Sequence, residues 1–261
     1  MTTETTIVVT PWHDPDQRDR FLDAWDVLDT LRPDLVLQHD ANREGCAVTK
    51  NKGVAEALRR GADTVVVLDD DCFPTTSTPT LTSLVLQHLE ALRPQPVTMF
   101  AEIADPPPRG TPFQNRSITM PVAASMGFWS DVPDYCAVRQ LAFDCGPMEF
   151  RPSTIVDRYF PLCGMNLAFR PADWAPWCSF IDVPRFDDIW MGWLWQREAY
   201  RRRACFNTAG PIVRHSRQSN VWANLRDEVT HLQSNDTLWR DIATHASDDY
   251  DTLNRLLPHH D

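Results

Sequence analysis

Thr64-Val65-Val66-Val67-Leu68, followed directly by Asp69-Asp70-Asp71, is the stretch of sequence that decides the fold. A continuous run of β-branched and apolar residues is typical of a strand that is buried on both faces of a parallel sheet. On its N-terminal side, strand and helix patterns alternate at Thr5–Thr10, Phe21–Leu31, Leu35–Asp40 and Val48–Arg60. Repeated β-α units of this kind predict an α/β fold with a doubly wound, mostly parallel, Rossmann-type sheet, whose ligands bind beyond the carboxyl ends of the strands.

The segments after the acids continue this pattern less regularly. Further strands and helices are predicted at Val97–Ala101, Cys163–Phe169, Asp187–Arg203 and Ala209–His215. Val221–Leu257 is expected to be largely helical, with breaks around Ser234 and Ser247. Since no internal repeat or linker divides the chain, we expect residues 1–220 to form one α/β domain and residues 221–261 a helical C-terminal extension packed on it.

The chain of 261 residues is acidic, because 25 Lys and Arg residues stand against 36 Asp and Glu residues, a net charge of −11. This balance argues against nucleic acid, which needs an excess of positive charge. No apolar run is long enough for membrane insertion, the N-terminus shows no export signal, and seven dispersed cysteines fit reduced thiols. We therefore expect a cytoplasmic protein, and its ten tryptophans leave room for an aromatic interface in a homo-oligomer.

Three adjacent carboxylates at the end of a buried strand are the strongest chemical signal. They repel one another, so their presence together calls for a cation. Alternate residues of an extended chain point the same way, which lets Asp69 and Asp71 share one ligand while Asp70 faces elsewhere. Hard oxygen ligands suit Mg²⁺ or Mn²⁺. The alternatives are a solvated acidic turn and a phosphatase of the haloacid dehalogenase type, which Phe73 disfavours because that family has Thr or Val there.

Other charged residues form a second group of candidates. Lys50 and Lys52, the only lysines, lie where a predicted helix begins and favour a phosphate there, or form a solvated basic turn. Asp187 and Asp188 open another predicted helix, as capping residues or as groups that orient hydroxyls or act as a base. His215 follows a predicted strand, where it completes a metal shell or is an ordinary hydrogen-bonded side chain.

Six motifs support a family resemblance. In chain order they are LDDDC (Leu68–Cys72), RGTPFQNR (Arg109–Arg116), PDYCAVRQL (Pro133–Leu141), FPLCGMNLAF (Phe160–Phe169), RFDDIWMGW (Arg185–Trp193) and HSRQSNVWANL (His215–Leu225). Together they resemble the reversibly glycosylated polypeptides, nucleotide-sugar pyranose/furanose mutases best known as the plant UDP-arabinopyranose mutases.

The resemblance implies a fold similar to the GT-A nucleotide-sugar fold and a set of roles for matching residues. Asp69 and Asp71 would bind a divalent metal, typically Mn²⁺, that carries the diphosphate, and Asp70 matches the middle acid. Arg109 falls on the reversibly glycosylated arginine of the family, and Arg116 matches a second arginine of that stretch that the family needs for activity. This chain is shorter than the plant enzymes and differs from them beside Arg116.

Nucleotide and sugar contacts are expected from further segments. The base should meet side chains at 10–12 and 40–43, including Thr10 and Asp40, and the sugar should lie beside Cys163–Asn166, with Asn166 as a contact.

The implied reaction is the interconversion of the pyranose and furanose forms of a nucleotide-diphosphate sugar. It needs no redox step, and the chain has no GxGxxG fingerprint for a flavin. The preference for Arg over Lys and the small size suggest a bacterial, high-GC origin, which favours GDP-L-fucose over UDP-L-arabinose. Two alternatives stay open, a GT-A glycosyltransferase that uses a separate acceptor and a non-catalytic nucleotide-sugar-binding scaffold.

Overall fold

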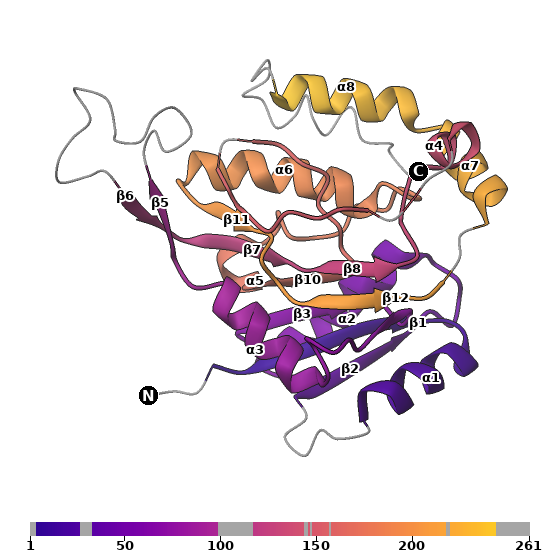
Figure 1. Ribbon diagram of the computed structural model, residues 1–261, viewed down its shortest axis with the longest axis horizontal. Coiled ribbons are helices and arrows are strands. Elements are labelled where there is room, and N and C mark those ends of the chain that lie inside the picture. The colour runs from indigo at the N-terminus through magenta and orange to yellow at the C-terminus, as the bar shows by residue number, and fades with distance from the viewer. Residues whose placement is uncertain are drawn as a thin grey trace.

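The computed structural model describes residues 4–26, 33–98, 117–143, 146, 148–156, 158–217 and 220–243. A seven-stranded central sheet runs through this part of the chain (Figure 1). From one edge to the other its strands are β2 (Asp34–His39), β1 (Thr6–Trp12), β3 (Thr64–Leu68), β10 (Asn166–Phe169), β7 (Val122–Met126), β11 (Cys205–Asn207) and β9 (Thr154–Ile155).

The central sheet is mixed, with most strands running the same way. β2, β1 and β3 pair in parallel, β10 is antiparallel to both β3 and β7, β11 is parallel to β7, and β9 is antiparallel to β11. Only β10 and β9 therefore oppose the direction of the others within this sheet. The predicted α/β fold with a mostly parallel sheet is confirmed, and β3 has the bounds that the apolar run predicts.

The strand next to β3 on the side away from β1 is β10, and not the segment that the sequence predicted. We predicted the next strand at Val97–Ala101, but β5 (Gln95–Thr98) pairs with β6 (Ser117–Met120) in a two-stranded antiparallel ribbon outside the central sheet. Pro96 of β5 has no N–H to donate, which suits an edge ribbon better than a central strand. Residues 99–101 of this prediction lie outside the described residues.

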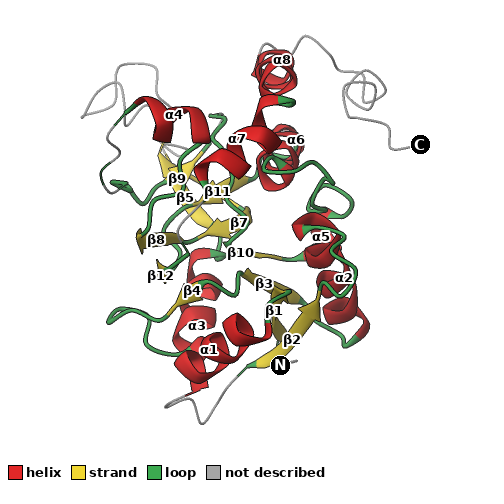
Figure 2. Ribbon diagram, turned by 90° about the vertical axis from the view of Figure 1, so that its right-hand side faces the viewer, coloured by secondary structure: helices red, strands yellow, loops and turns green. Residues whose placement is uncertain are grey.

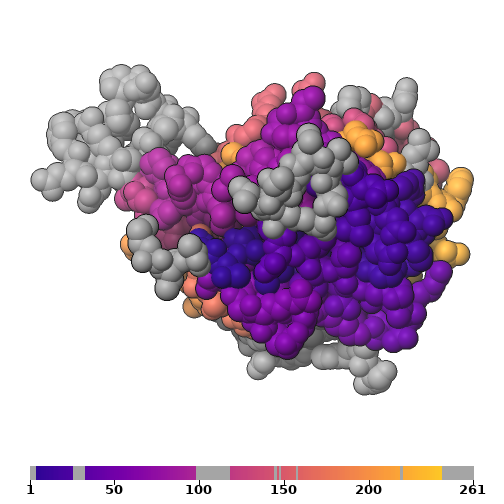
Figure 3. Space-filling view, turned by 90° about the horizontal axis from the view of Figure 1, so that it is seen from below, coloured from indigo at the N-terminus to yellow at the C-terminus, as the bar shows by residue number. Residues whose placement is uncertain are grey.

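Helices cover both faces of the sheet. Figure 2 shows α1 (Pro15–Asp26) and α3 (Leu81–Ala91) on one side of β1 and β3, and α2 (Cys46–Arg59) and α5 (Pro171–Trp174) on the other. The side chains of β3 alternate between two cores, because Val66 and Leu68 pack with α1 and α3, whereas Val65 and Val67 pack with α2 and α6 (Asp187–Arg201). This double burial explains why the strand is apolar throughout. Seen from below, the surface is mostly the N-terminal part of the chain (Figure 3).

A smaller sheet brings the C-terminal third of the chain to the acid cluster. It consists of β4 (Cys72–Phe73), β12 (Ile212–His215) and β8 (Phe128–Asp131), with β12 in the middle. β12 runs antiparallel to β4, and the register places His215 opposite Cys72. His215 is therefore held next to the acids by strand pairing.

The C-terminal helices close one side of the molecule. α7 (Val221–Val229) contacts α4 (Ala137–Ala142), and α8 (Leu232–Ala243) packs Leu238 and Ile242 into an aromatic cluster with Trp190 and Trp193 of α6. The helical prediction is confirmed for the described part, but the break lies at 230–231 rather than at Ser234. Ser247 lies outside the described residues.

A buried histidine joins α3 to the central sheet. His88 Nδ1 lies 2.9 Å from Ser125 Oγ on β7, and His88 Nε2 lies 2.9 Å from Asn166 Oδ1 on β10. The side chain has no exposed surface, and this burial lowers its pKa from 6.5 to about 4. The imidazole is therefore neutral in the folded protein at neutral pH.

The buried His88 makes the stability of the protein depend on pH. Because the unfolded chain binds a proton at His88 before the folded protein does, we expect His88 alone to lower the free energy of unfolding by about 3 kcal/mol as the pH decreases from 6.5 to 4. Urea unfolding across this range measures the effect. His88→Gln should remove this part of the pH dependence, whereas His13→Gln, at an exposed position, should preserve it. Identical pH profiles for wild type and His88→Gln would contradict the prediction.

Candidate functional site

A pocket of about 510 Å³ opens at the carboxyl end of β3. Its wall comes from segments that are far apart in the sequence: α2, the acids after β3, the residues before β10, the N-terminus of α6 and the end of β12. The charged side chains that line it are Lys50, Asp69, Asp71, Asp134, Arg185, Asp187, Asp188, His215, Arg217 and Glu228. Six of the residues predicted from sequence are therefore gathered in one pocket, namely Lys50, Asp69, Asp71, Asp187, Asp188 and His215.

Lys50 is a buried cation in contact with the first acid. Its Nζ lies 2.9 Å from Asp69 Oδ1 and donates a hydrogen bond of 3.1 Å to the Gly164 carbonyl oxygen. The antiparallel pairing of β10 with β3 brings this carbonyl to the acid cluster, because the Asp69 N–H bonds Met165 O just before β10. Burial lowers the pKa of Lys50, but the carboxylate of Asp69 more than offsets it, so the net pKa is raised and the side chain stays an ammonium ion.

The two acids at the start of α6 reach the same place from the other side. The Gly164 N–H donates a hydrogen bond of 2.7 Å to Asp188 Oδ2, so Gly164 contacts Asp188 through its N–H and Lys50 through its carbonyl oxygen. Burial and the neighbouring Asp187 raise the pKa of Asp188 to about 7. Asp187 Oδ2 is buried, and no described residue hydrogen-bonds to it. Burial also raises the pKa of Asp187.

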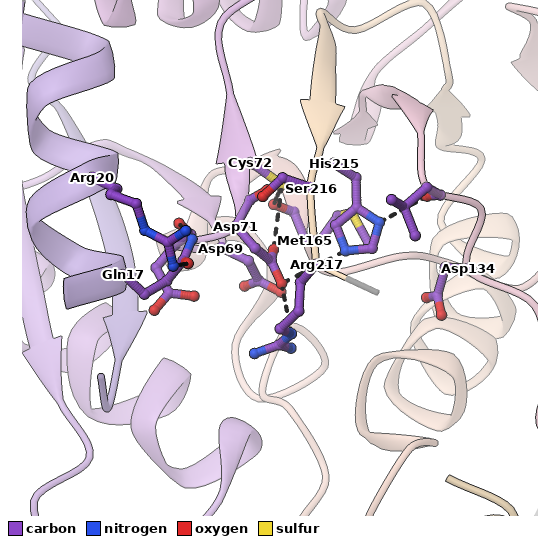
Figure 4. A network of polar contacts seen from close by, with 12 residues as sticks. Gln17, Arg20, Asp69, Asp71, Cys72, Asp134, Met165, His215, Ser216 and Arg217 are labelled. Atoms are coloured by element: carbon purple, nitrogen blue, oxygen red, sulfur yellow. Dashed lines mark hydrogen bonds and ion pairs between the residues drawn. The ribbon is translucent and has the colours of Figure 1, made fainter. Parts of the chain in front are cut away.

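Asp71 lies between two basic side chains (Figure 4). Its Oδ2 is 3.6 Å from His215 Nε2 and 3.1 Å from Arg217 Nε. His215 is oriented by its other nitrogen, since Nδ1 lies 2.8 Å from the Val132 carbonyl oxygen. Burial lowers the pKa of His215, but the Asp71 carboxylate outweighs it and raises the net pKa. The Ser216 N–H bonds the Asp71 carbonyl oxygen at 3.1 Å and fixes the backbone on which Arg217 is mounted.

Asp70 faces away from the pocket, as predicted, but the cause is a turn and not an extended chain, since the Cys72 N–H bonds the Asp69 carbonyl oxygen at 3.0 Å. Its backbone carbonyl accepts a hydrogen bond of 2.8 Å from Gln17 of α1. The side chain is buried, and its Oδ2 has no partner among the residues that the structure describes. Burial and the charges of Asp71 and Asp69 raise the pKa of Asp70 to about 7.

Four further residues predicted to contact nucleotide or sugar do not line this pocket. Thr10 is buried in β1, and Asp40 accepts hydrogen bonds from the N–H groups of Glu44 and Gly45 in the loop before α2. Lys52 is exposed and pairs with Glu44, because residues two apart on a helix point to nearly opposite sides. The side chain of Asn166 is occupied inside the protein, where it meets His88 and donates to Pro211 O at 2.9 Å.

The two arginines that the family resemblance singled out, Arg109 and Arg116, lie outside the described residues.

A cluster that the sequence reasoning missed lines the pocket near α4 and α7. Arg185 Nη2 is 3.3 Å from Asp134 Oδ1, and Arg185 Nε is 3.2 Å from Glu228 Oε1. Glu228 is buried on α7, and its Oε2 accepts the N–H of Ala137 at the start of α4. Arg185 is the first residue of the RFDDIWMGW motif and could have been proposed as a site residue from the sequence. Nothing in the sequence of α7 distinguishes Glu228 from an ordinary surface acid.

The pocket offers donors of the kind that a hard divalent cation takes, without a ready-made cage. Asp69 and Asp71 supply carboxylate oxygens and His215 an imidazole nitrogen on one wall. Within the described ranges, no three His, Cys, Asp or Glu side chains stand close enough together to hold a metal ion as they are. Each carboxylate instead contacts a basic side chain, Lys50 at Asp69 and Arg217 at Asp71.

The sequence also matches a family model. The model, described as "Reversibly glycosylated polypeptide", covers residues 58–240, which include every pocket acid named above. The chain belongs to the reversibly glycosylated polypeptide family. The resemblance seen in the six motifs is thereby confirmed.

Plant members of the reversibly glycosylated polypeptide family are similar over about two thirds of this chain. The probable UDP-arabinopyranose mutase 1 of Pisum sativum is 33% identical over 187 residues, which are 63% of this chain and 50% of that protein. UDP-arabinopyranose mutase 3 of Arabidopsis thaliana is 31% identical over 191 residues, or 64% of this chain and 51% of that protein. The chain thus spans about half the length of the curated relatives it matches.

Among solved structures, the mannosyltransferase PcManGT from Pyrobaculum calidifontis, in complex with GDP-Man and Mn²⁺, aligns with a TM-score of 0.41 at 14% identity. The alignment covers 98% of this chain and 79% of that one.

None of the helices in the described ranges combines the length and the apolar character that crossing a membrane requires.

Proposed function

We propose that this chain is a mutase that interconverts the pyranose and furanose forms of a nucleotide-diphosphate sugar. The observation that carries the proposal is the pocket itself, in which Lys50 and the acid pairs Asp69/Asp71 and Asp187/Asp188 meet at the carboxyl end of β3 in a member of this family. Ligands of α/β sheets bind at this edge. The names of the plant relatives support the reaction class.

The chemistry asks for charge stabilisation and proton transfer. A pyranose becomes a furanose when the bond between the anomeric carbon and the diphosphate breaks and a different hydroxyl of the sugar bonds to the anomeric carbon, giving up its proton. The bond from the anomeric carbon to the former ring oxygen breaks, and that oxygen takes up a proton. The diphosphate then returns to the anomeric carbon, so no oxidant or reductant is consumed. A cation stabilises the negative charge that develops on the leaving diphosphate.

Two acids of the pocket suit the proton transfers. Asp187 presents an oxygen that no described residue occupies, and Asp188 has a pKa of about 7. A group with a pKa near the working pH exchanges protons efficiently in either direction. We assign to this pair the orientation of sugar hydroxyls and the movement of protons during ring opening. For Arg109 the family resemblance predicts either covalent trapping of the sugar or stabilisation of the diphosphate, and for Arg116 it predicts a contact with the same phosphates.

We further propose that Asp69 and Asp71, with His215, hold a divalent metal ion, Mn²⁺ or Mg²⁺. When bound, the metal would supply positive charge for the diphosphate.

The metal proposal is tested by Mn²⁺ binding, measured by electron paramagnetic resonance without substrate. We expect Asp71→Asn to weaken Mn²⁺ binding at least about tenfold, since an amide is a poorer ligand than a carboxylate. Asp19→Asn removes an equal charge from the exposed surface pair with Arg18 and should leave the affinity unchanged. Equal affinity of wild type and Asp71→Asn would contradict the assignment.

Turnover of the nucleotide sugar alone tests the function. Wild-type protein is incubated with Mn²⁺ and with UDP-L-arabinose or GDP-L-fucose, and the products are separated by chromatography and weighed by mass spectrometry. UDP-L-arabinose comes first because the plant relatives are named for it; the preference for GDP-L-fucose remains a prediction that the same assay decides. We expect a new isomer of unchanged mass without any acceptor. Release of free sugar and nucleotide, or turnover that depends on an added acceptor, would contradict the mutase.

A further inference from the structure

A nucleotide diphosphate brings negative charge to a pocket that is already rich in acids. Six of the charged side chains in its wall are carboxylates, namely Asp69, Asp71, Asp134, Asp187, Asp188 and Glu228. The basic side chains that line it are Lys50, Arg185, His215 and Arg217. Which of these is free to meet the phosphates is decided by burial and by existing contacts.

Lys50 and Arg185 are committed to carboxylate partners in the pocket wall. Lys50 has a side chain only 3% exposed and is held by Asp69 and by the Gly164 carbonyl. Arg185 bridges Asp134 and Glu228, of which Glu228 is buried. Turning either cation toward a ligand would leave a buried carboxylate without its partner, which costs several kcal/mol.

Arg217 differs from both in exposure and in the way it is held. Its side chain is 60% exposed, and the contact with Asp71 Oδ2 is made through Nε. Figure 4 shows the terminal nitrogens of the guanidinium pointing away from Asp71. The backbone just before it is fixed to Asp71 by Ser216. The backbone that carries Arg217 is thus fixed, and the terminal N–H groups of its guanidinium face solvent at the pocket.

We propose that Arg217 binds the diphosphate of the nucleotide sugar, an assignment that rests on the proposed function. The guanidinium fork matches two phosphate oxygens in one plane, which a lysine ammonium does not. In the ligand-free protein the carboxylate of Asp71 holds the guanidinium in place and compensates its charge. The diphosphate accepts hydrogen bonds from the terminal nitrogens of the Arg217 guanidinium, while Nε keeps its contact with Asp71.

The test is the affinity for UDP, measured by titration calorimetry in the presence of Mn²⁺, with GDP run in parallel. Because a hydrogen bond to a charged group contributes more than a neutral one, we expect Arg217→Gln to raise the Kd at least about tenfold. Arg217→Lys should keep part of the affinity. The affinity for UMP, which lacks the second phosphate, should be reduced less by Arg217→Gln than the affinity for UDP. Thermal unfolding of each variant checks that the fold is intact.

Arg214→Gln is the matched control. Arg214 lies three residues earlier, on β12, is exposed, and stacks its guanidinium over the Phe73 ring instead of lining the pocket. Arg214→Gln removes the same charge as Arg217→Gln. Equal weakening of UDP binding in both variants would indicate a general loss of positive charge and would overturn the assignment. Unchanged affinity of a folded Arg217→Gln would also overturn it. Wild-type protein that binds neither UDP nor GDP would contradict the proposed function and this assignment together.

Discussion

Lys50→Met lowers the free energy of unfolding by about 3–5 kcal/mol and removes turnover of the nucleotide sugar. The ammonium group lies 2.9 Å from a carboxylate oxygen of Asp69, and its side chain is 3% exposed. Removing one partner of a buried ion pair leaves the other charge without compensation, which is far more costly than the loss of a surface pair. The Gly164 carbonyl also loses its donor. Urea unfolding measures the stability, and the isomer assay measures the activity.

Lys52→Met is the control for this substitution. Lys52 lies on the same helix and pairs with Glu44 at the surface, so its loss should change the stability by less than about 1 kcal/mol. The double variant Lys50→Met/Asp69→Asn should recover part of the stability without recovering activity, because it removes the unpaired charge but also removes Asp69, a proposed metal ligand. A stable, fully active Lys50→Met variant would show that the buried pair does not support the site.

Gly127→Ala destabilises the protein by about 3 kcal/mol, at the upper end of what overpacking usually costs. Gly127 lies between β7 and β8, and a Cβ there would overlap the side chain of Asn166 and the carbonyl oxygen of Pro211. Both groups are fixed, since the Asn166 amide group donates to Pro211 O and its Oδ1 accepts from His88 Nε2. The clash therefore cannot be relieved by moving one flexible side chain. Urea unfolding measures the loss.

The same substitution should disturb the pocket. β10 begins at Asn166, two residues after Gly164, so a shift of β10 moves the carbonyl that Lys50 contacts. We expect weaker UDP binding as well as lower stability. Gly146→Ala is the control, because no described atom lies within 4 Å of its added Cβ. Equal stability of the two variants would refute the packing argument.

Sequence patterns predicted the elements whose burial is periodic or continuous. β3 was placed correctly because a strand buried on both faces must be apolar at every position, and the acids mark its end. The neighbour of β3 was not predictable in this way. β10 enters the sheet from about a hundred residues further on and runs antiparallel, a choice made by long-range packing that Val97–Ala101 does not reveal.

The candidate site was predictable where chemistry and strand ends coincide. Asp69 and Asp71 were found because carboxylates at the end of a buried strand are conspicuous, and the structure places both in the pocket. Lys50 and Lys52 look equivalent in sequence, and only the orientation of α2 separates the buried cation from the surface one. Asn166 reads as a polar ligand residue, but its hydrogen bonds to the interior are invisible in a sequence.

Contacts between distant segments account for what the sequence missed. Arg185 and Glu228 are 43 positions apart, and their pairing depends on how α7 packs beside α4. His215 was predicted as a site residue, but its contact with Asp71 depends on the register of β12 on β4. Neither relation follows from local spacing, because each is fixed by tertiary packing.

We propose that this pocket breaks and restores the bond between the sugar and the diphosphate without an acceptor. The direct measurement uses a nucleotide sugar whose bridging oxygen, between the anomeric carbon and the diphosphate, is isotopically heavy. We predict that the heavy oxygen spreads to the non-bridging positions of the same phosphate, followed by phosphorus NMR, while an isomer of unchanged mass accumulates. An isomer that keeps all of its heavy oxygen in the bridge would contradict the account.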